Sequence, residues 1–114
     1  MKPLIAMAEL AEGQMTTRRV DGVSVLVCRV EGQYYALHNE CTHAGQALHT
    51  GKLKGYELKC PLHGGRFDIR TGACQGAPVT EPVTTFPVTL EGGKVNVAVS
   101  GVEPRALPKF GPLN

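Results

Sequence analysis

The 114-residue sequence contains no tryptophan and only three tyrosines and three phenylalanines. With twelve Lys and Arg residues against ten Asp and Glu residues, it offers neither an aromatic stacking platform nor a basic stripe, so nucleic acid is not an expected partner. No apolar run approaches the roughly 20 residues of a membrane span, and residues 4–8 are too short an apolar segment for a secretory signal. We therefore expect no membrane association and a cytoplasmic location, where thiols stay reduced.

Turn-forming residues are abundant, and they divide the sequence into short segments. The dipeptides Asp21-Gly22, Glu31-Gly32 and Gly92-Gly93 each favour a two-residue hairpin turn. The segments that they separate are residues 14–20, 23–30 and 33–37 early in the chain, and residues 84–90 and 94–99 late in it. No window of eleven or more residues has a helical period. The sequence predicts one all-β domain over residues 1–114.

The middle of the chain has a different composition from its two ends. Residues 39–80 hold three of the four cysteines and three of the four histidines, with short strand candidates at residues 56–59 and 66–69. We expect residues 1–38 and 81–100 to supply the scaffold strands and residues 39–80 to be an insertion that holds a site. Residues 101–114 show no pattern, and we expect a loosely packed or disordered C-terminal tail.

Two short motifs in this insertion pair a cysteine with a histidine. They are Cys41-Thr42-His43 and Cys60-Pro61-Leu62-His63, and a glycine follows closely after each. Each could form a tight loop that presents a thiolate and an imidazole to a shared metal site. Zinc can bind two thiolates and two imidazoles in a tetrahedral site. In its usual structural sites, however, two cysteines lie on one short loop and the two histidines lie elsewhere in the sequence. Here each loop mixes the two ligand types.

Both motifs resemble the ligand loops of Rieske [2Fe-2S] proteins. The matching residues are 41–45 and 60–68, with Thr71-Gly72 following. The resemblance implies the Rieske fold, an antiparallel β-sandwich scaffold with an inserted small cluster-binding subdomain, and one [2Fe-2S] cluster. In that family one iron takes two cysteines and the other takes two histidines. This carries over as Cys41 with Cys60 and His43 with His63, and no catalytic residue is expected.

Departures from the family's high-potential branch indicate a low reduction potential. That branch joins its two loops by a disulfide, at positions that correspond to Gln46 and Leu62. It also has two hydroxyls that donate to cluster sulfurs, where this sequence has Gly65 and Phe67. Because such hydrogen bonds stabilise the reduced state, we expect a potential near the bottom of the Rieske range, about −150 mV.

The remaining cysteines and histidines are expected to have structural roles. Cys28 lies in a hydrophobic segment and is predicted to be a small buried residue, and Cys74 to be a packing residue. His38 and His49 are assigned to the surface or to loops. Asp68 is expected to form a turn, and Pro78, by the resemblance, to belong to a loop that covers the cluster.

The resemblance implies a soluble, monomeric ferredoxin of bacterial aromatic-ring-hydroxylating dioxygenase systems. Its transient partners would be a flavin-dependent NAD(P)H reductase and a terminal oxygenase, and Arg66 would weakly steer an acidic partner. The chain is not expected to be the oxygenase, because a mononuclear iron needs two further histidines and a carboxylate, and only His38 and His49 remain. The alternatives are a Rieske-like small subunit of an assimilatory reductase, such as nitrite reductase, and a structural Cys2His2 zinc module.

Overall fold

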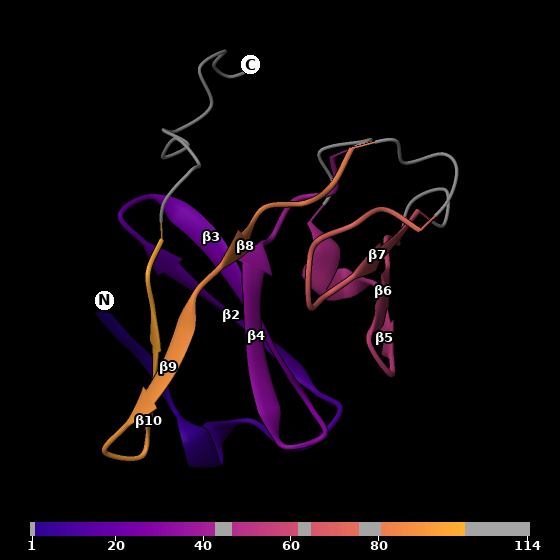
Figure 1. Cartoon of the computed structure of the whole chain (residues 1–114). Helices are drawn as coiled ribbons and strands as arrows, with labels where there is room; N and C mark the ends of the chain where they lie inside the picture. Colours follow the sequence, from indigo (N-terminus) through magenta and orange to yellow (C-terminus); the bar gives the residue numbers. More distant parts are fainter. Residues whose placement is uncertain (1, 43–46, 62–64, 76–80, 100–114) are drawn as a thin grey trace.

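Three antiparallel sheets make up the computed structural model, which describes residues 2–42, 47–61, 65–75 and 81–99. Figure 1 shows a larger scaffold on one side and a small separate sheet, β5 to β7, on the other. The two helices among the described residues are single 3-10 turns, η1 (Met7–Glu9) and η2 (Leu48–Thr50). The prediction of an all-β fold is confirmed, and the part of the chain described holds no helix long and apolar enough to cross a membrane.

The scaffold consists of two sheets. The first has the order β1 (Lys2–Ala6), β10 (Lys94–Val97) and β9 (Val88–Glu91), so it joins the two ends of the chain. The second has the order β2 (Met15–Val20), β3 (Val23–Val30), β4 (Gln33–His38) and β8 (Thr85–Phe86). The small third sheet has the order β5 (Lys52–Lys54), β6 (Glu57–Lys59) and β7 (Arg66–Asp68).

The three predicted hairpin turns are present, and both central residues of each have a positive φ. In the β2–β3 turn, for example, Asp21 has φ 49° and Gly22 has φ 84°. The β3–β4 turn places the non-glycine residue Glu31 at φ 53°. The carboxylate of Glu12 accepts hydrogen bonds from the backbone N–H groups of Glu31 and Gly32, and these bonds hold that turn in place. The same two hydrogen bonds lower the pKa of Glu12.

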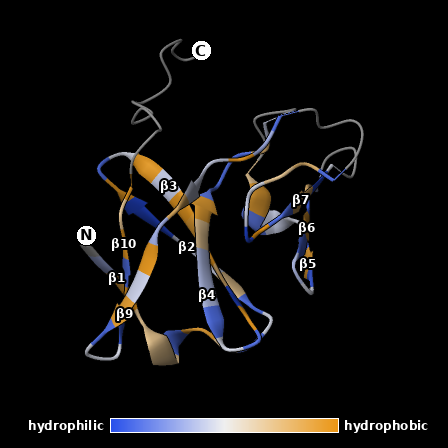
Figure 2. Cartoon of the chain, in the orientation of Figure 1, coloured by the Kyte–Doolittle hydropathy of each residue, from blue (hydrophilic) through white to orange (hydrophobic). Residues whose placement is uncertain are grey.

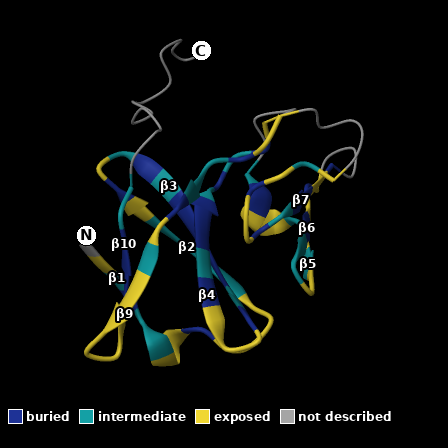
Figure 3. Ribbon diagram, in the orientation of Figure 1, coloured by how far each residue is buried: buried dark blue, intermediate teal, exposed yellow. Residues whose placement is uncertain are grey.

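The middle sheet is covered on both faces. Alternate residues of β3 enter two different cores. Val23, Val25 and Val27 pack toward the first sheet together with Val95 and Val97. Figure 2 shows how apolar β3 is, and Figure 3 shows that β3 and β4 hold buried residues while most of β9 is exposed.

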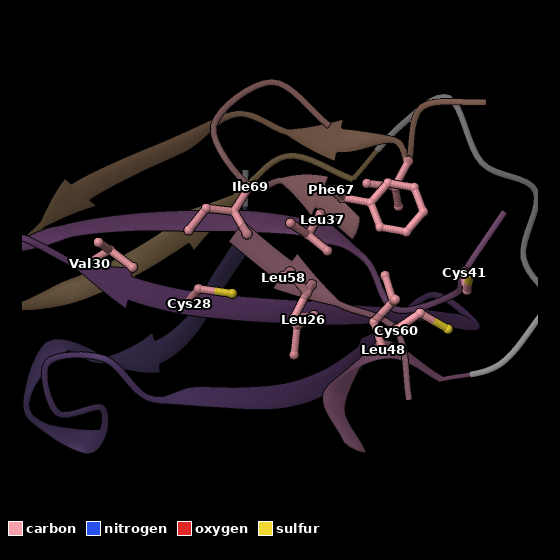
Figure 4. Packing of buried hydrophobic residues seen from close by; sticks show 11 residues of the cluster. Leu26, Cys28, Val30, Leu37, Cys41, Leu48, Leu58, Cys60, Phe67 and Ile69 are labelled. Atoms are coloured by element: carbon pink, nitrogen blue, oxygen red, sulfur yellow. The ribbon is translucent and has the colours of Figure 1, made fainter. Parts of the chain in front are cut away.

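The other side of β3 packs against the small sheet. This second core combines Leu26, Cys28, Val30 and Leu37 of the scaffold with residues from the middle of the chain, and Figure 4 shows it from close by. Those further residues are Cys41, Leu48, Leu58, Cys60, Phe67, Ile69 and Val83. The small sheet is therefore fixed to the scaffold through a shared apolar core.

Strands β1 and β5 were not predicted from the sequence, and the single strand predicted at residues 84–90 is divided at Pro87 into β8, which pairs with β4, and β9, which pairs with β10. Strand β1 lies in the segment considered for an export signal, and β5 contains one apolar residue, Leu53, between two lysines. The predicted strand at residues 66–69 ends at Asp68, because that residue begins a turn. The proposed division into scaffold, insertion and tail stays a prediction, and residues 101–114 lie outside the described residues.

Candidate metal centre

Cys41 and Cys60 lie at the same end of the core that joins the small sheet to the scaffold. Each has only 1% of its surface exposed, and Figure 4 places both away from Val30 and Cys28 at the opposite end. All four cysteines lie in the described part of the chain, and each is a thiol rather than half of a disulfide. Two buried thiols brought together from positions 19 apart in the sequence fit the sulfur half of an iron–sulfur ligand set.

The two predicted histidine ligands, His43 and His63, lie outside the described residues. Among the residues that are described, no group of three or more His, Cys, Asp or Glu side chains is placed to hold a metal ion. The geometry therefore supports the sulfur half of the predicted set, and the imidazole half stays a prediction.

Cys60 directly follows β6 and is held by the residue before β7. Its backbone N–H donates to the carbonyl oxygen of Gly65 at 2.6 Å, so the hydrogen bonding between the two strands continues past Lys59 and Arg66. The strands on either side are anchored by Leu58 and Phe67, which are fully buried and directly opposite one another. The position of Cys60 is thus fixed by the shared core.

Cys41 is held by a buried asparagine two residues before it. Asn39 is 7% exposed, and its backbone N–H donates to the carbonyl of Ser24 in β3 at 2.9 Å. Its side-chain Oδ1 accepts the backbone N–H of His49 at 2.9 Å, and its Nδ2 lies 3.1 Å from Ser24 Oγ and 3.0 Å from His49 Nδ1. Asn39 therefore joins the scaffold to both sides of the first loop.

Pro78 lies outside the described residues, but Gln75 and Glu81, which flank residues 76–80, are hydrogen-bonded to the two motif segments. The hydroxyl of Thr42 donates to the carbonyl of Glu81 at 2.7 Å. On the other side, the backbone N–H of Gln75 donates to the carbonyl of Arg66, and the Arg66 guanidinium donates to the carbonyl of Gln75 at 3.2 Å. Gln75 and Glu81 are thus each held by a residue close to one of the two cysteines.

Asp68 forms the turn that was predicted for it. Its carboxylate accepts hydrogen bonds from the backbone N–H of Arg70 and from the Arg70 guanidinium at 2.8 to 3.0 Å, and these bonds lower the pKa of Asp68. Gly72 completes the turn at φ 82°, where a Cβ would lie 2.0 Å from the carbonyl oxygen of Val83. Only glycine fits there, which gives a physical reason for the Thr71-Gly72 pair.

Cys28, Cys74 and His49 have the roles expected of them, whereas His38, which was assigned to the surface or to a loop, is the half-buried last residue of strand β4. Cys28 is fully buried, and desolvation raises the pKa of its thiol to about 12, so it stays protonated. Cys74 packs against the shared core opposite Phe67. His38 Nε2 lies 3.8 Å from a carboxylate oxygen of Glu40, and His49 is the exposed partner of Asn39.

Asn39 and Thr42 position the site, but the sequence did not identify them. Their partners are 15 and 39 residues away along the chain, so no local spacing reveals these contacts. A polar residue two positions before a cysteine motif is only a weak signal for Asn39. The positions without hydroxyls, Gly65 and Phe67, are both buried.

Comparison with known proteins identifies the family. The sequence model of the Rieske [2Fe-2S] domain matches residues 1–87. The ferredoxin component of the naphthalene 1,2-dioxygenase system of Pseudomonas aeruginosa is 42% identical over 96 residues, which cover 84% of this chain and 92% of that protein. The chain belongs to the Rieske [2Fe-2S] family.

Solved structures agree with this assignment. The ferredoxin of carbazole 1,9a-dioxygenase from Nocardioides aromaticivorans IC177 superposes with a TM-score of 0.83 and 36% identity, covering 88% of this chain and all of that one. A chain in the complex of reduced oxygenase and oxidized ferredoxin of carbazole 1,9a-dioxygenase superposes with a TM-score of 0.80 and 35% identity, covering 84% and 90%. The protein is a ferredoxin, an electron-transfer component rather than a catalytic oxygenase, and it carries one [2Fe-2S] cluster.

Proposed function

We propose that this ferredoxin carries single electrons from a flavin-dependent NAD(P)H reductase to the terminal oxygenase of an aromatic-ring-hydroxylating dioxygenase system. The observation that carries the proposal is the pair of buried thiols, Cys41 and Cys60, at one end of the shared core. A single redox site at the end of a small β domain suits a carrier that meets its partners one at a time. Redox encounters of this kind use small, short-lived interfaces.

We further propose that Cys41 and Cys60 hold one iron and that His43 and His63 hold the other. When bound, the cluster supplies a one-electron couple whose potential is raised by the two neutral imidazoles in place of thiolates. The protein's own contribution is to bury the two sulfur ligands in an apolar core and to fix their loops. Asn39 and the Cys60 to Gly65 hydrogen bond do the fixing.

The partners are proposed from relatives of this chain. The carbazole 1,9a-dioxygenase structure contains an oxygenase together with its ferredoxin, which supports a transient complex with a terminal oxygenase here. The reductase follows from the need for an electron source in such a system. We propose that the ferredoxin works as a monomer in the cytoplasm, where its four cysteines remain reduced and form no disulfide.

Electron paramagnetic resonance of the dithionite-reduced protein tests the ligand set. A Rieske centre gives a signal of low average g value, which an all-cysteine cluster does not. We expect this signal to disappear in the variants Cys41→Ser, Cys60→Ser, His43→Ala and His63→Ala. The matched control Cys74→Ala, whose residue packs beside the site, should keep the signal. A signal that survives the loss of either histidine would refute the assignment.

The two alternative functions predict different results. A structural zinc module would be colourless, whereas this protein should absorb in the visible. A small subunit of an assimilatory reductase would copurify with a large subunit, whereas a ferredoxin should be stable alone. The relatives favour the ferredoxin, since those compared are ferredoxin components of dioxygenase systems.

A further inference from the structure

Three basic side chains lie in one row across the small sheet. The register pairs Lys52 of β5 directly with Lys59 of β6, and Lys59 directly with Arg66 of β7. Residues that are directly opposite in an antiparallel sheet place their side chains on the same face, and like charges in such pairs repel one another. The neighbouring rung, Leu53, Leu58 and Phe67, faces the core instead. The basic row is therefore on the outer face, and all three of its residues are exposed.

Most of the acidic groups near this row are already engaged. Asp68 accepts two hydrogen bonds from the Arg70 guanidinium, and Glu57 lies 3.5 Å from Arg66. Lys52 and Lys59 form no ion pair with any described residue, and nine of the ten Asp and Glu residues of the chain are described. The row thus keeps two ammonium groups without a carboxylate partner among the described residues. They make the electrostatic potential outside this face of the sheet more positive.

The positive charge of the chain is concentrated in this region. Residues 47–75 hold five of the twelve Lys and Arg residues but only two of the ten Asp and Glu residues, which gives a formal charge of +3. The rest of the chain, with seven basic and eight acidic residues, carries −1. Three cations in direct opposition on a sheet of nine residues repel one another, so this row does not stabilise the sheet.

The row is also the rung of the sheet nearest to the candidate metal centre. Lys59 directly precedes Cys60, and Arg66 directly follows Gly65, whose carbonyl accepts the Cys60 N–H. Lys52 follows Gly51, where the chain passes so close to Lys59 that a Cβ would lie 1.9 Å from its carbonyl oxygen. A partner bound to this row would therefore lie beside Cys60.

We propose that the row Lys52, Lys59 and Arg66 is an electrostatic docking surface for the acidic surface of a redox partner protein. The proposal rests on the proposed function, since it concerns how the electron carrier meets its partners. One cluster must be both reduced and oxidised at the same end of the molecule, so donor and acceptor would present similar acidic surfaces in turn. Complementary charge speeds such encounters and makes their rate depend on salt.

Oxidation of the dithionite-reduced holoprotein by small ions tests the row without a known partner. In stopped-flow experiments, ferricyanide, which is a trivalent anion, takes one electron from the reduced cluster and becomes ferrocyanide. Hexaammineruthenium(III), a trivalent cation, takes one electron in the same way. For an approach distance of about 10 Å, screened Coulomb attraction gives each lysine a rate factor of about four at 10 mM salt and about two at 0.1 M.

The readout is the rate constant with ferricyanide divided by the rate constant with hexaammineruthenium(III). A changed reduction potential of the cluster alters both rate constants in the same direction and so affects their ratio little. In Lys59→Gln this ratio should fall by on the order of tenfold at 10 mM salt, and in Lys52→Gln/Lys59→Gln by on the order of a hundredfold. The matched control is Lys94→Gln, which removes one charge from the β9–β10 hairpin on the other side of the molecule (Figure 1). Equal falls in Lys59→Gln and Lys94→Gln would mean that only net charge matters and would overturn the proposal.

Poly-L-glutamate serves as a probe for an acidic protein surface. It should slow the reaction of the wild-type protein with ferricyanide and should have little effect on Lys52→Gln/Lys59→Gln. A single-stranded oligonucleotide that inhibits more strongly than poly-L-glutamate of equal charge would refute an acidic protein as the occupant. Absence of the cluster's visible absorption would count against the proposed function, whereas a coloured protein with unchanged rate ratios would refute the docking surface alone.

Discussion

Replacing Asn39 by alanine should separate the first cysteine loop from the scaffold. The substitution removes the acceptor for the His49 backbone N–H and the amide that contacts Ser24 Oγ and His49 Nδ1. Each neutral hydrogen bond contributes about 1 kcal/mol net. Because His49 is exposed and water can replace part of what is lost, we expect Asn39→Ala to lower the free energy of unfolding by about 2–3 kcal/mol.

That loss should lower the melting temperature of the holoprotein by about 8–15 °C, given the usual entropy of unfolding for a domain of this size. The assay is a thermal scan at one fixed rate, followed by visible absorption for the cluster and by far-ultraviolet circular dichroism for the strands. Ser24→Ala is the matched control, since it removes only one of the side-chain partners and keeps the backbone hydrogen bond from Asn39 to Ser24. Ser24→Ala should lower the free energy of unfolding by about 1 kcal/mol.

The reasoning fails if Asn39→Ala melts within about 2 °C of the wild type, or if it is no less stable than Ser24→Ala. Either result would mean that the two sides of the loop are held by something other than this asparagine. If the asparagine is responsible, visible absorption should be lost at a lower temperature than the dichroism of the scaffold.

Four further predictions concern the turn, pH, cluster removal and redox potential. Gly72→Ala should cost on the order of 2–4 kcal/mol in urea unfolding, because it combines a left-handed backbone with a backbone clash, whereas Gly13→Ala, at φ 79° with nothing within 4 Å, should cost only about 1 kcal/mol. Asp68 has a lowered pKa in the folded protein, so its stabilising effect is complete above the unfolded value of 3.8 and is lost as the pH falls through the lower folded value; Asp68→Asn should therefore flatten the acid-unfolding curve in that range, and an unchanged curve would contradict this. Hydrogen exchange on the apoprotein should show β5 to β7 exchanging before β2 to β4, and uniform protection would argue against it. A redox titration should give a midpoint near about −150 mV, and a clearly positive value would rule out the low-potential assignment.

The hairpins could be predicted because the information lies in adjacent residues. Asp21-Gly22 and Gly92-Gly93 tolerate positive φ at both central positions, and the turn sets the register of the strands on either side. Strand β5 could not be predicted, since its three residues become a strand only by pairing with β6. Its Lys-Leu-Lys sequence is too short for an alternation to stand out.

In the candidate site too, the sequence identifies the residues that form local motifs but not those that act through distant contacts. The spacing of the two motifs identifies Cys41 and Cys60, and the structure places both at one end of one core. Asn39 and Thr42 could not be identified, because their contacts join segments that are close only after folding. The basic row was likewise invisible, since only the register of three strands shows that Lys52, Lys59 and Arg66 are neighbours.

The two-sided packing of β3 limits how this redox unit could be transplanted. Residues 39–80 look like a self-contained module along the sequence, yet Leu26, Cys28, Val30 and Leu37 of the scaffold supply part of the core into which this segment packs. A graft of the two cysteine loops with β5 to β7 onto another protein would expose Leu58 and Phe67 to water. The smallest part that could be transferred as an electron carrier therefore has to include β3 and β4. The protein that receives it must also cover the face of β3 formed by Val23, Val25 and Val27.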